Sequence, residues 1–430
     1  MLAYLKKFNT INIRLFIFTS PIKFLSSLGF IFCNIFLIKI VDKEQLGNFI
    51  LCLSLISLLS IFSKAGFNYS ALKLMSIIYY KNQKNKFLPY VKQILFVSGL
   101  ISLVIIFFII IFEDFIAMNI YKNDQIRGLL FIMILSLPFY TLVQIQKSII
   151  KSFRFPYLAP IGDMGMLLIF IIILTYVSNY VGFNITIYRL AFLFLITNII
   201  LFAFFNLLII IILFKKFKSF EDNRDDIKNN SFNSKSLLDF FIIDFVNYVF
   251  VWGSIFICSF FLDGENLTNF SSIYWLAFAP LFICIVLNSI YSPIFAINYN
   301  QGNIIKLKKY FNECRRMTIY LCFPIASIFL LFSSYILNLV FNITNTEHIY
   351  CFKILIIATL IRIFFGPVQN ILNMCRYENY VKKITFIISV FQIISMFVLL
   401  NYYGVISIGF SYLVFNLLRY SLLYKKYKSI

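Results

Sequence analysis

Long apolar runs, interrupted by short polar stretches, fill this chain of 430 residues. About twelve of these runs approach the ~20 residues with which an α-helix crosses the hydrocarbon core of a membrane. The pattern therefore predicts an all-α integral membrane protein with about twelve transmembrane helices. We expect them at roughly 24–40, 47–63, 94–112, 128–146, 160–178, 190–214, 237–262, 270–291, 317–341, 351–374, 384–400 and 404–423.

Lysine and arginine gather in every second connection between the runs. They are dense at the amino terminus, in the tail, and in the connections near residues 64–92, 147–154, 215–235, 306–316 and 376–383. Basic connections stay on the cytoplasmic side, so both termini are expected there, in a protein of the cytoplasmic (inner) membrane. The first run has a basic flank and no small-residue cleavage pattern, so we expect no cleaved signal peptide.

One connection is typical of a linker. Residues 215–236 are polar and charged, and they divide the chain into an amino-terminal six-helix lobe at 1–214 and a carboxy-terminal one at 237–430. Four residues of the first half have similar counterparts 229 residues later: Pro138 and Pro367, Gln144 and Asn373, Lys147 and Arg376, Arg154 and Lys383. A duplicated six-helix unit would produce this register, and a chance alignment is the alternative.

Composition supports a membrane protein. Apolar residues make up 61% of the chain and its mean hydropathy is +0.90, which is too apolar for a soluble globule. The net charge of +21 resides largely in the expected cytoplasmic connections. That charge has a topological cause, and no compact basic domain indicates nucleic acid as a partner.

No catalytic or metal-binding pattern is visible. The eight cysteines form no C-x-x-C pair and fall mainly in predicted spans, so we interpret them as packing residues. The single histidine, His348, is expected to be a solvated residue of a short outer connection. There is no nucleophile–base pair, no phosphate-binding glycine loop and no long outer loop for membrane glycan chemistry. The sequence thus predicts a non-enzyme without a cofactor or a metal.

Several short segments together carry a family resemblance. They are Gln45-Leu46-Gly47-Asn48-Phe49, Ser63-Lys64-Ala65-Gly66-Phe67, Ser272-Ile273-Tyr274-Trp275, Pro293, Ile336-Leu337-Asn338-Leu339-Val340-Phe341 and Tyr403-Gly404-Val405-Ile406-Ser407-Ile408-Gly409. Their order and spacing over nearly the whole chain resemble the polysaccharide repeat-unit flippases (Wzx type) of the multidrug/oligosaccharidyl-lipid/polysaccharide exporter (MOP) superfamily.

This resemblance implies a two-lobed transporter that moves a polyprenyl-pyrophosphate-linked oligosaccharide across the cytoplasmic membrane by alternating access. The cargo would be a repeat unit of O-antigen lipopolysaccharide, capsule or a related surface polysaccharide. Its other partners would be membrane lipid and a coupling ion, a proton or sodium. Two positions depart from the family: Ser254 stands where many relatives have an acidic residue, and Ser272 where glycine is usual. The departure at Ser254 puts ion coupling through that position in doubt.

A pyrophosphate needs a polar, cationic cavity, and the tenth span offers one candidate lining. Its residues Arg362, Gly366, Gln369, Asn373 and Arg376 follow at helical spacing, so they are expected on one side of a helix. We expect Arg362 near mid-membrane, where a guanidinium fork can grip a pyrophosphate. The alternative is that Arg362 pairs with Asp244 and locks the carboxy-terminal lobe.

A second polar stripe is expected in the fourth span, where Tyr140, Gln144, Lys147 and Lys151 lead toward the cytoplasmic mouth. They would meet an incoming pyrophosphate, or the two lysines would only mark the cytoplasmic flank. Lys353, nine residues before Arg362, falls on the opposite helix face and is expected to reach the outer interface.

Other polar residues occur in pairs on apolar helices. Asn34, near Ser27, is a candidate for sugar contact, and Asp244 with Asn247 is a candidate for ion coupling or for a structural role. Hydrogen bonds between helices would explain each of these pairs equally well.

Other function classes remain open. The resemblance to one superfamily also admits a multidrug or small-molecule antiporter, which the basic stripes disfavour because cationic drugs call for acidic linings. A lipid II flippase is a closer alternative, although such relatives usually carry two more spans. A membrane glycan polymerase or ligase is disfavoured by the missing outer loop.

Overall fold

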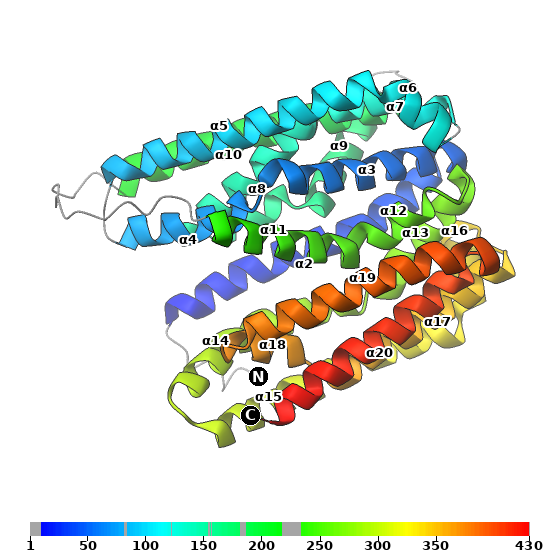
Figure 1. The fold of residues 1–430 in the computed structure, drawn as a ribbon. Helices are drawn as coiled ribbons and strands as arrows, with labels where there is room; N and C mark the ends of the chain where they lie inside the picture. Colours follow the sequence, from blue (N-terminus) through cyan, green and yellow to red (C-terminus); the bar gives the residue numbers. More distant parts are fainter. Residues whose placement is uncertain are drawn as a thin grey trace. The chain divides into compact units, whose positions relative to one another are not determined.

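The computed structural model describes residues 10–80, 84–121, 123–153, 155, 157–180, 186–216 and 234–429. Within these residues every regular element is a helix (Figure 1). The helices are α2 (Thr10–Ile38), α3 (Lys43–Lys64), α4 (Phe67–Tyr80), α5 (Lys84–Ile111), α6 (Glu113–Phe115), η1 (Ile116–Ile120), α7 (Gln125–Ile134), α8 (Leu137–Ser152), η2 (Ala159–Gly162), α9 (Met164–Tyr180), α10 (Ile187–Lys216), α11 (Ser234–Tyr248), η3 (Val249–Gly253), α12 (Ser254–Cys258), α13 (Gly264–Phe278), α14 (Leu281–Asn300), α15 (Ile304–Leu331), α16 (Ser333–Phe341), α17 (Thr346–Phe365), α18 (Val368–Met374), α19 (Glu378–Tyr403) and α20 (Ile406–Lys428).

The predicted all-helical membrane fold is confirmed. Nine helices in the described ranges are long and apolar enough to cross a membrane, or up to eleven if each of two bent pairs counts as one span. A shorter apolar helix, Met164–Ser178, is not included in this number. The chain is a multi-pass membrane protein.

Two compact units make up the fold. The first unit contains the described residues of Met1–Cys33 and Leu51–Tyr248, and the second contains Asn34–Ile50 and those of Val249–Ile430. The prediction of two six-helix lobes joined by a linker at 215–236 stays a prediction. Most of that linker, residues 217–233, lies outside the described residues.

The first unit is built around α8. This helix packs against α4, α5 and α10, and most of its residues are buried, including Tyr140, Val143 and Lys147. Burying a helix on all sides is possible here because its neighbours are almost wholly apolar. A buried lysine on such a helix requires a partner, which the site below provides.

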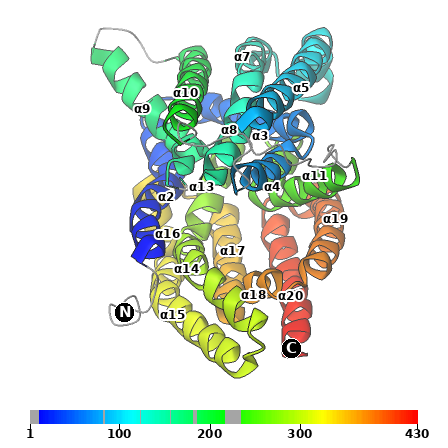
Figure 2. The same ribbon diagram turned by 90° about the vertical axis from the view of Figure 1, so that its left-hand side faces the viewer.

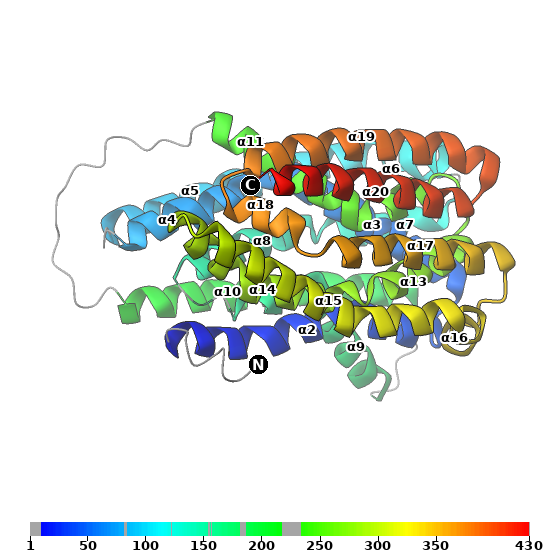
Figure 3. The same ribbon diagram turned by 90° about the horizontal axis from the view of Figure 1, so that it is seen from below.

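The second unit is built around α17 and α20, which are its most extensively packed pair. Helices α19 and α20 run side by side in both Figure 1 and Figure 3. On the other side of α17 lies the hairpin of α14 and α15, and α18 packs against α14 and α20 (Figure 2). Buried aromatic and aliphatic residues such as Phe295, Phe311 and Leu372 fill the space between these helices.

Prolines break three expected spans. Pro138 lies in the first turn of α8, after a 44° bend from α7, and Pro280 precedes α14 after a 46° bend from α13. Pro367 caps the short helix α18, and only Gly366 lies between it and the end of α17 at Phe365. Proline lacks the amide hydrogen and clashes with the preceding turn, so it begins a helix more readily than it continues one. The residues Pro138 and Pro367, paired in the proposed repeat, thus both stand at helix breaks.

The tenth span was wrongly expected to be one helix over 351–374. It consists of α17 and α18, and Gly366 between them has φ of 71°, a left-handed conformation that favours glycine. Arg315 of α15 closes the break, because its Nε donates a 2.6 Å hydrogen bond to the carbonyl of Phe364. Two further boundaries differ: the connection after residue 64 contains α4, and the ninth span begins at Ile304.

Candidate functional site

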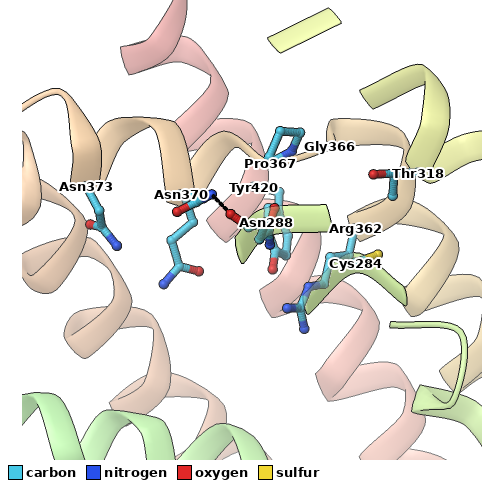
Figure 4. A pocket seen from close by; sticks show the side chains of 10 residues that line it. Cys284, Asn288, Thr318, Arg362, Gly366, Pro367, Asn370, Asn373 and Tyr420 are labelled. Atoms are coloured by element: carbon cyan, nitrogen blue, oxygen red, sulfur yellow. Dashed lines mark hydrogen bonds between the residues drawn. The ribbon is translucent and has the colours of Figure 1, made fainter. Parts of the chain in front are cut away.

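A polar pocket of about 230 Å³ opens in the second unit beside the break between α17 and α18 (Figure 4). It is lined by residues of α14, α15, α17, α18 and α20 and of the break itself: Cys284, Asn288, Thr318, Arg362, Gly366, Pro367, Gln369, Asn370, Asn373 and Tyr420. This lining consists mostly of amides, hydroxyls and one guanidinium, and it contains no carboxylate.

Arg362 supplies the charge of this pocket. It lies in the last turn of α17, half-buried, and its side chain is one of those displayed in Figure 4. Among the described residues no carboxylate forms an ion pair with it. A guanidinium that faces a polar hollow without an acidic partner is a site for an anion.

The amides of the pocket are held in place by α14. Ser292 Oγ donates to Asn370 Oδ1 at 2.9 Å, and Asn370 Nδ2 donates to the carbonyl of Asn288 at 3.2 Å. The second of these bonds is drawn in Figure 4. These bonds join the short helix α18 to α14, so the amide groups form a preorganised surface of donors and acceptors.

A second arginine, which the sequence reasoning missed, lies directly behind the pocket wall. Arg419 of α20 is only 7% exposed, and its Nη2 donates a 2.8 Å hydrogen bond to Gln369 Oε1. Its guanidinium carbon lies 3.9 Å from the centre of the Phe250 ring, a cation–π arrangement. An arginine inside an apolar run was the available signal, because intramembrane charges mark functional sites by default.

The structure brings together most of the predicted residues of the tenth span, though not by the expected geometry. Arg362, Gln369 and Asn373 share the pocket through the helix break, whereas a continuous helical stripe was expected. Arg376 does not line it; it follows α18 in a left-handed turn with φ of 65° and is exposed. Lys353 lies 5.6 Å from the Tyr350 ring centre in the first half of α17. The roles assigned to these residues stay predictions.

The predicted residues of the fourth span form a polar centre in the first unit. Lys147 Nζ contacts Asp163 Oδ1 at 2.5 Å, Gln144 Oε1 at 2.8 Å and the carbonyl of Gly162 at 3.3 Å. Lys23 Nζ contacts the other carboxylate oxygen of Asp163 at 2.6 Å. Lys151 is exposed beyond this centre. The role of Asp163 as the partner of Lys147 was not predicted, because the path of the chain through η2 is what brings Asp163 to α8.

The charge state of this centre follows from the same contacts. The ammonium groups of Lys147 and Lys23 each contact one oxygen of the Asp163 carboxyl group and so stabilise its ionised form. The carboxylate is therefore ionised, and it forms an ion pair with Lys147. Contact of Lys147 with a substrate stays a prediction, and the substrate would have to compete with Asp163 for this lysine.

Asp244 and Asn247 have partners within the first unit. Asp244 Oδ2 lies 3.7 Å from Lys64 Nζ, and Asn247 Nδ2 donates to the hydroxyl of Tyr69 at 3.4 Å. Within this unit Asp244 thus pairs with Lys64, and the alternative of an Arg362–Asp244 lock stays a prediction. Asn34 is buried, at 7% exposure, near the end of α2.

Two further expectations concern the single histidine and the cysteines. The expectation for His348 was wrong: it is buried at 1% exposure in the first turn of α17. All eight cysteines are buried free thiols. No group of three or more metal-ligating side chains occurs among the residues that the structure describes.

No protein-family model matches the chain, and neither does any curated protein. Solved structures match it over nearly its whole length. An inward-facing multidrug resistance MATE family transporter of the MOP superfamily is 10% identical, with 98% of this chain and 97% of that chain covered at a TM-score of 0.69.

The lipid II flippase MurJ, in an inward closed conformation, is 16% identical over 96% of this chain and 87% of that chain, at a TM-score of 0.71. A MOP superfamily transporter from Pyrococcus furiosus, described as having a binding pocket of reverse polarity, is 11% identical over 96% and 95% of the chains, at 0.65. At these identities the comparisons establish a shared fold, that of MOP superfamily transporters.

Proposed function

We propose that this protein is a flippase that carries polyprenyl-pyrophosphate-linked oligosaccharide across the cytoplasmic membrane. The observation that carries the proposal is Arg362, a guanidinium in a polar pocket whose described lining contains no acid. A pyrophosphate supplies paired anionic oxygens for the guanidinium fork, and the amides of Asn288, Asn370 and Asn373 offer hydrogen bonds to sugar hydroxyls. The polyprenyl tail would remain in lipid.

The shared fold supports transport as the activity. In secondary transporters, discontinuous helices commonly form the substrate site, and here the pocket lies at the break between α17 and α18. Alternating access between the two lobes, with export toward the periplasmic or outer leaflet, completes the proposal. It concerns surface polysaccharide repeat units such as those of O-antigen or capsule, and a proton or sodium ion as the coupling ion.

The test is transport by the purified protein in vesicles. A fluorescent undecaprenyl-pyrophosphate disaccharide is placed in both leaflets, and an impermeant quencher reports how fast the shielded leaflet loses its label. Losing a charge-assisted contact of about 1.5–3 kcal/mol predicts that Arg362→Ala slows transport at least tenfold. Arg362→Lys, which keeps the charge and loses the fork, should retain part of the rate.

Lys353→Ala is the matched control, since it removes another cation from α17 outside the pocket. It should transport at the wild-type rate when vesicle incorporation is equal. Equal rates for Arg362→Ala and the wild type would refute the site, and a wild type that moves no pyrophosphate-linked lipid would refute the function.

A lipid II flippase is the second candidate, supported by the likeness to MurJ at a TM-score of 0.71. Lipid II carries the same pyrophosphate, so Arg362 does not distinguish the two cargoes. Offering lipid II and an oligosaccharide repeat-unit lipid to the same vesicles does so, because the preferred glycan is then read directly.

The proposed orientation can be tested with single cysteines. All eight native cysteines are buried, so an exposed new thiol reacts against a low background. We expect Glu265→Cys and Thr346→Cys, both exposed, to react with an impermeant maleimide from outside the cell. Gln301→Cys, between α14 and α15, should react only after the membrane is opened. Reaction of Gln301→Cys in intact cells would reverse the proposed topology.

A further inference from the structure

Arg419 is a buried cation with neutral partners. Its contacts are the Gln369 carboxamide oxygen at 2.8 Å and the faces of the Phe250 and Tyr420 rings, and its Nε has no hydrogen-bond partner. No described carboxylate forms an ion pair with it. A buried charge held by one amide and two rings retains unused capacity to bind an anion.

The side chain of Gln369 connects this cation to the pocket. Gln369 lines the pocket with Arg362 and at the same time accepts the hydrogen bond of Arg419. Arg362 and Arg419 carry like charges and both lie beside the pocket-lining residues Gln369 and Tyr420, so they repel each other. A dianionic group placed in the pocket would relieve that repulsion by approaching both.

The position of Gln369 makes its displacement feasible. It lies in the first turn of α18, a helix of seven residues that begins directly after the break at Gly366 and Pro367. A carboxamide oxygen is a neutral acceptor, whereas a phosphate oxygen is charged and forms a hydrogen bond about twice as strong with a guanidinium. A phosphate that reaches Arg419 therefore outcompetes Gln369.

We propose that Gln369 is a placeholder on Arg419 and that a diphosphate displaces Gln369 when it binds. Arg362 and Arg419 then each hold one of the two phosphates. This inference rests on the proposed function and deepens it. It makes the pocket selective for diphosphate over monophosphate. It also links ligand binding to α18, because displacing Gln369 removes a hydrogen bond between α18 and α20.

The experiment measures thermal stabilisation of the purified full-length protein by farnesyl pyrophosphate and by farnesyl monophosphate. We expect the wild type to prefer the pyrophosphate. Gln369→Leu removes the competing hydrogen bond of about 0.5–1.5 kcal/mol, so it should bind farnesyl pyrophosphate roughly two- to tenfold more tightly. Arg419→Gln should reduce the preference for the pyrophosphate to about that of a single-arginine site.

Gln369→Glu gives the most diagnostic result. A carboxylate at this position pairs permanently with Arg419, so the ligand-free melting temperature should rise while farnesyl pyrophosphate binding weakens at least tenfold. Asn373→Asp is the matched control, since it adds the same charge to the same pocket at a residue that has no hydrogen bond to Arg419 among the described contacts. It should weaken binding less.

The outcomes separate this inference from the function it rests on. A wild type that farnesyl pyrophosphate does not stabilise overturns both. Stabilisation that is lost in Arg362→Ala and unchanged in Gln369→Leu and Arg419→Gln keeps the proposed function and overturns the placeholder. Equal weakening by Gln369→Glu and Asn373→Asp also overturns it, because the effect would then be general electrostatics.

Discussion

The polar centre of the first unit has two cationic side chains, and the pocket of the second unit has one in its lining and a second behind its wall, but the two regions differ in what faces those cations. In the first unit Asp163 contacts Lys147 at 2.5 Å and Lys23 at 2.6 Å. In the second unit Arg362 and Arg419 face amides, rings and open space. A buried cation by itself therefore identifies no site, since the first pair is satisfied internally. The absence of an acid from the described pocket lining is what indicates an external anion.

The largest effect should come from breaking the satisfied centre. Asp163→Asn leaves Lys147 buried without a counter-charge, so the free energy of unfolding should fall by about 3–5 kcal/mol. Thermal and denaturant unfolding in detergent measure this loss. Adding Lys147→Met should recover most of it, because the side chain of Lys23 is 40% exposed and can reach water.

The matched control is the exposed pair of Asp114 and Arg127, which lie 2.9 Å apart with side-chain exposures of 68% and 55%. Asp114→Asn should cost no more than about 1 kcal/mol, because water screens exposed ion pairs. If Asp163→Asn costs no more than this control, the first unit's centre is not a satisfied structural pair.

An intermediate effect distinguishes the two regions by ligand binding. Lys147→Met should leave the affinity for farnesyl pyrophosphate within about twofold of the wild type, since Lys147 already has Asp163 as its partner. Arg362→Gln should lower that affinity roughly tenfold or more, because it removes the fork and the charge. Isothermal titration in one detergent compares them. The reverse order would assign the anion to the fourth-span stripe.

Hydropathy and charge spacing predicted the helical membrane fold because long apolar runs have few other stable states in lipid. They did not predict the breaks at Pro280 and Gly366, where an apolar run continues through a change of helix direction.

Lys147 and Arg376 occupy equivalent positions in the proposed repeat. Lys147 is buried in a helix of sixteen residues, whereas Arg376 is exposed beyond a helix of seven. The two positions differ because the helix at the proline is longer in α8 than in α18, and tertiary packing decides that length.

The candidate site was predicted in part for a related reason. Arg362, Gln369 and Asn373 were found because local spacing groups residues that also meet in the pocket. Arg419 and Asp163 were missed, since their partners lie 50 and 16 residues away in sequence. Contacts over such distances depend on which helices pack together, and a single sequence carries little information on that.

The smallest expected effect concerns the Lys64–Asp244 pair, which lies between the two extremes of the comparison. Both side chains are largely buried, at 12% and 10% exposure, but their charged atoms are 3.7 Å apart and Asp244 Oδ2 lacks a hydrogen-bond partner. The pair is therefore looser than Lys147–Asp163, and a double-mutant cycle of Asp244→Asn and Lys64→Met should give a coupling energy of about 1 kcal/mol. The corresponding cycle at Asp163 and Lys147 should give about 3 kcal/mol, because those atoms are in direct contact. Combining Arg362→Ala with Asp244→Asn should give additive losses, since we assign Arg362 to the pocket of the second unit and Asp244 to its pair with Lys64. A coupling of more than about 0.5 kcal/mol in that last cycle would restore the Arg362–Asp244 lock and would remove the unpaired guanidinium on which the proposed anion site depends.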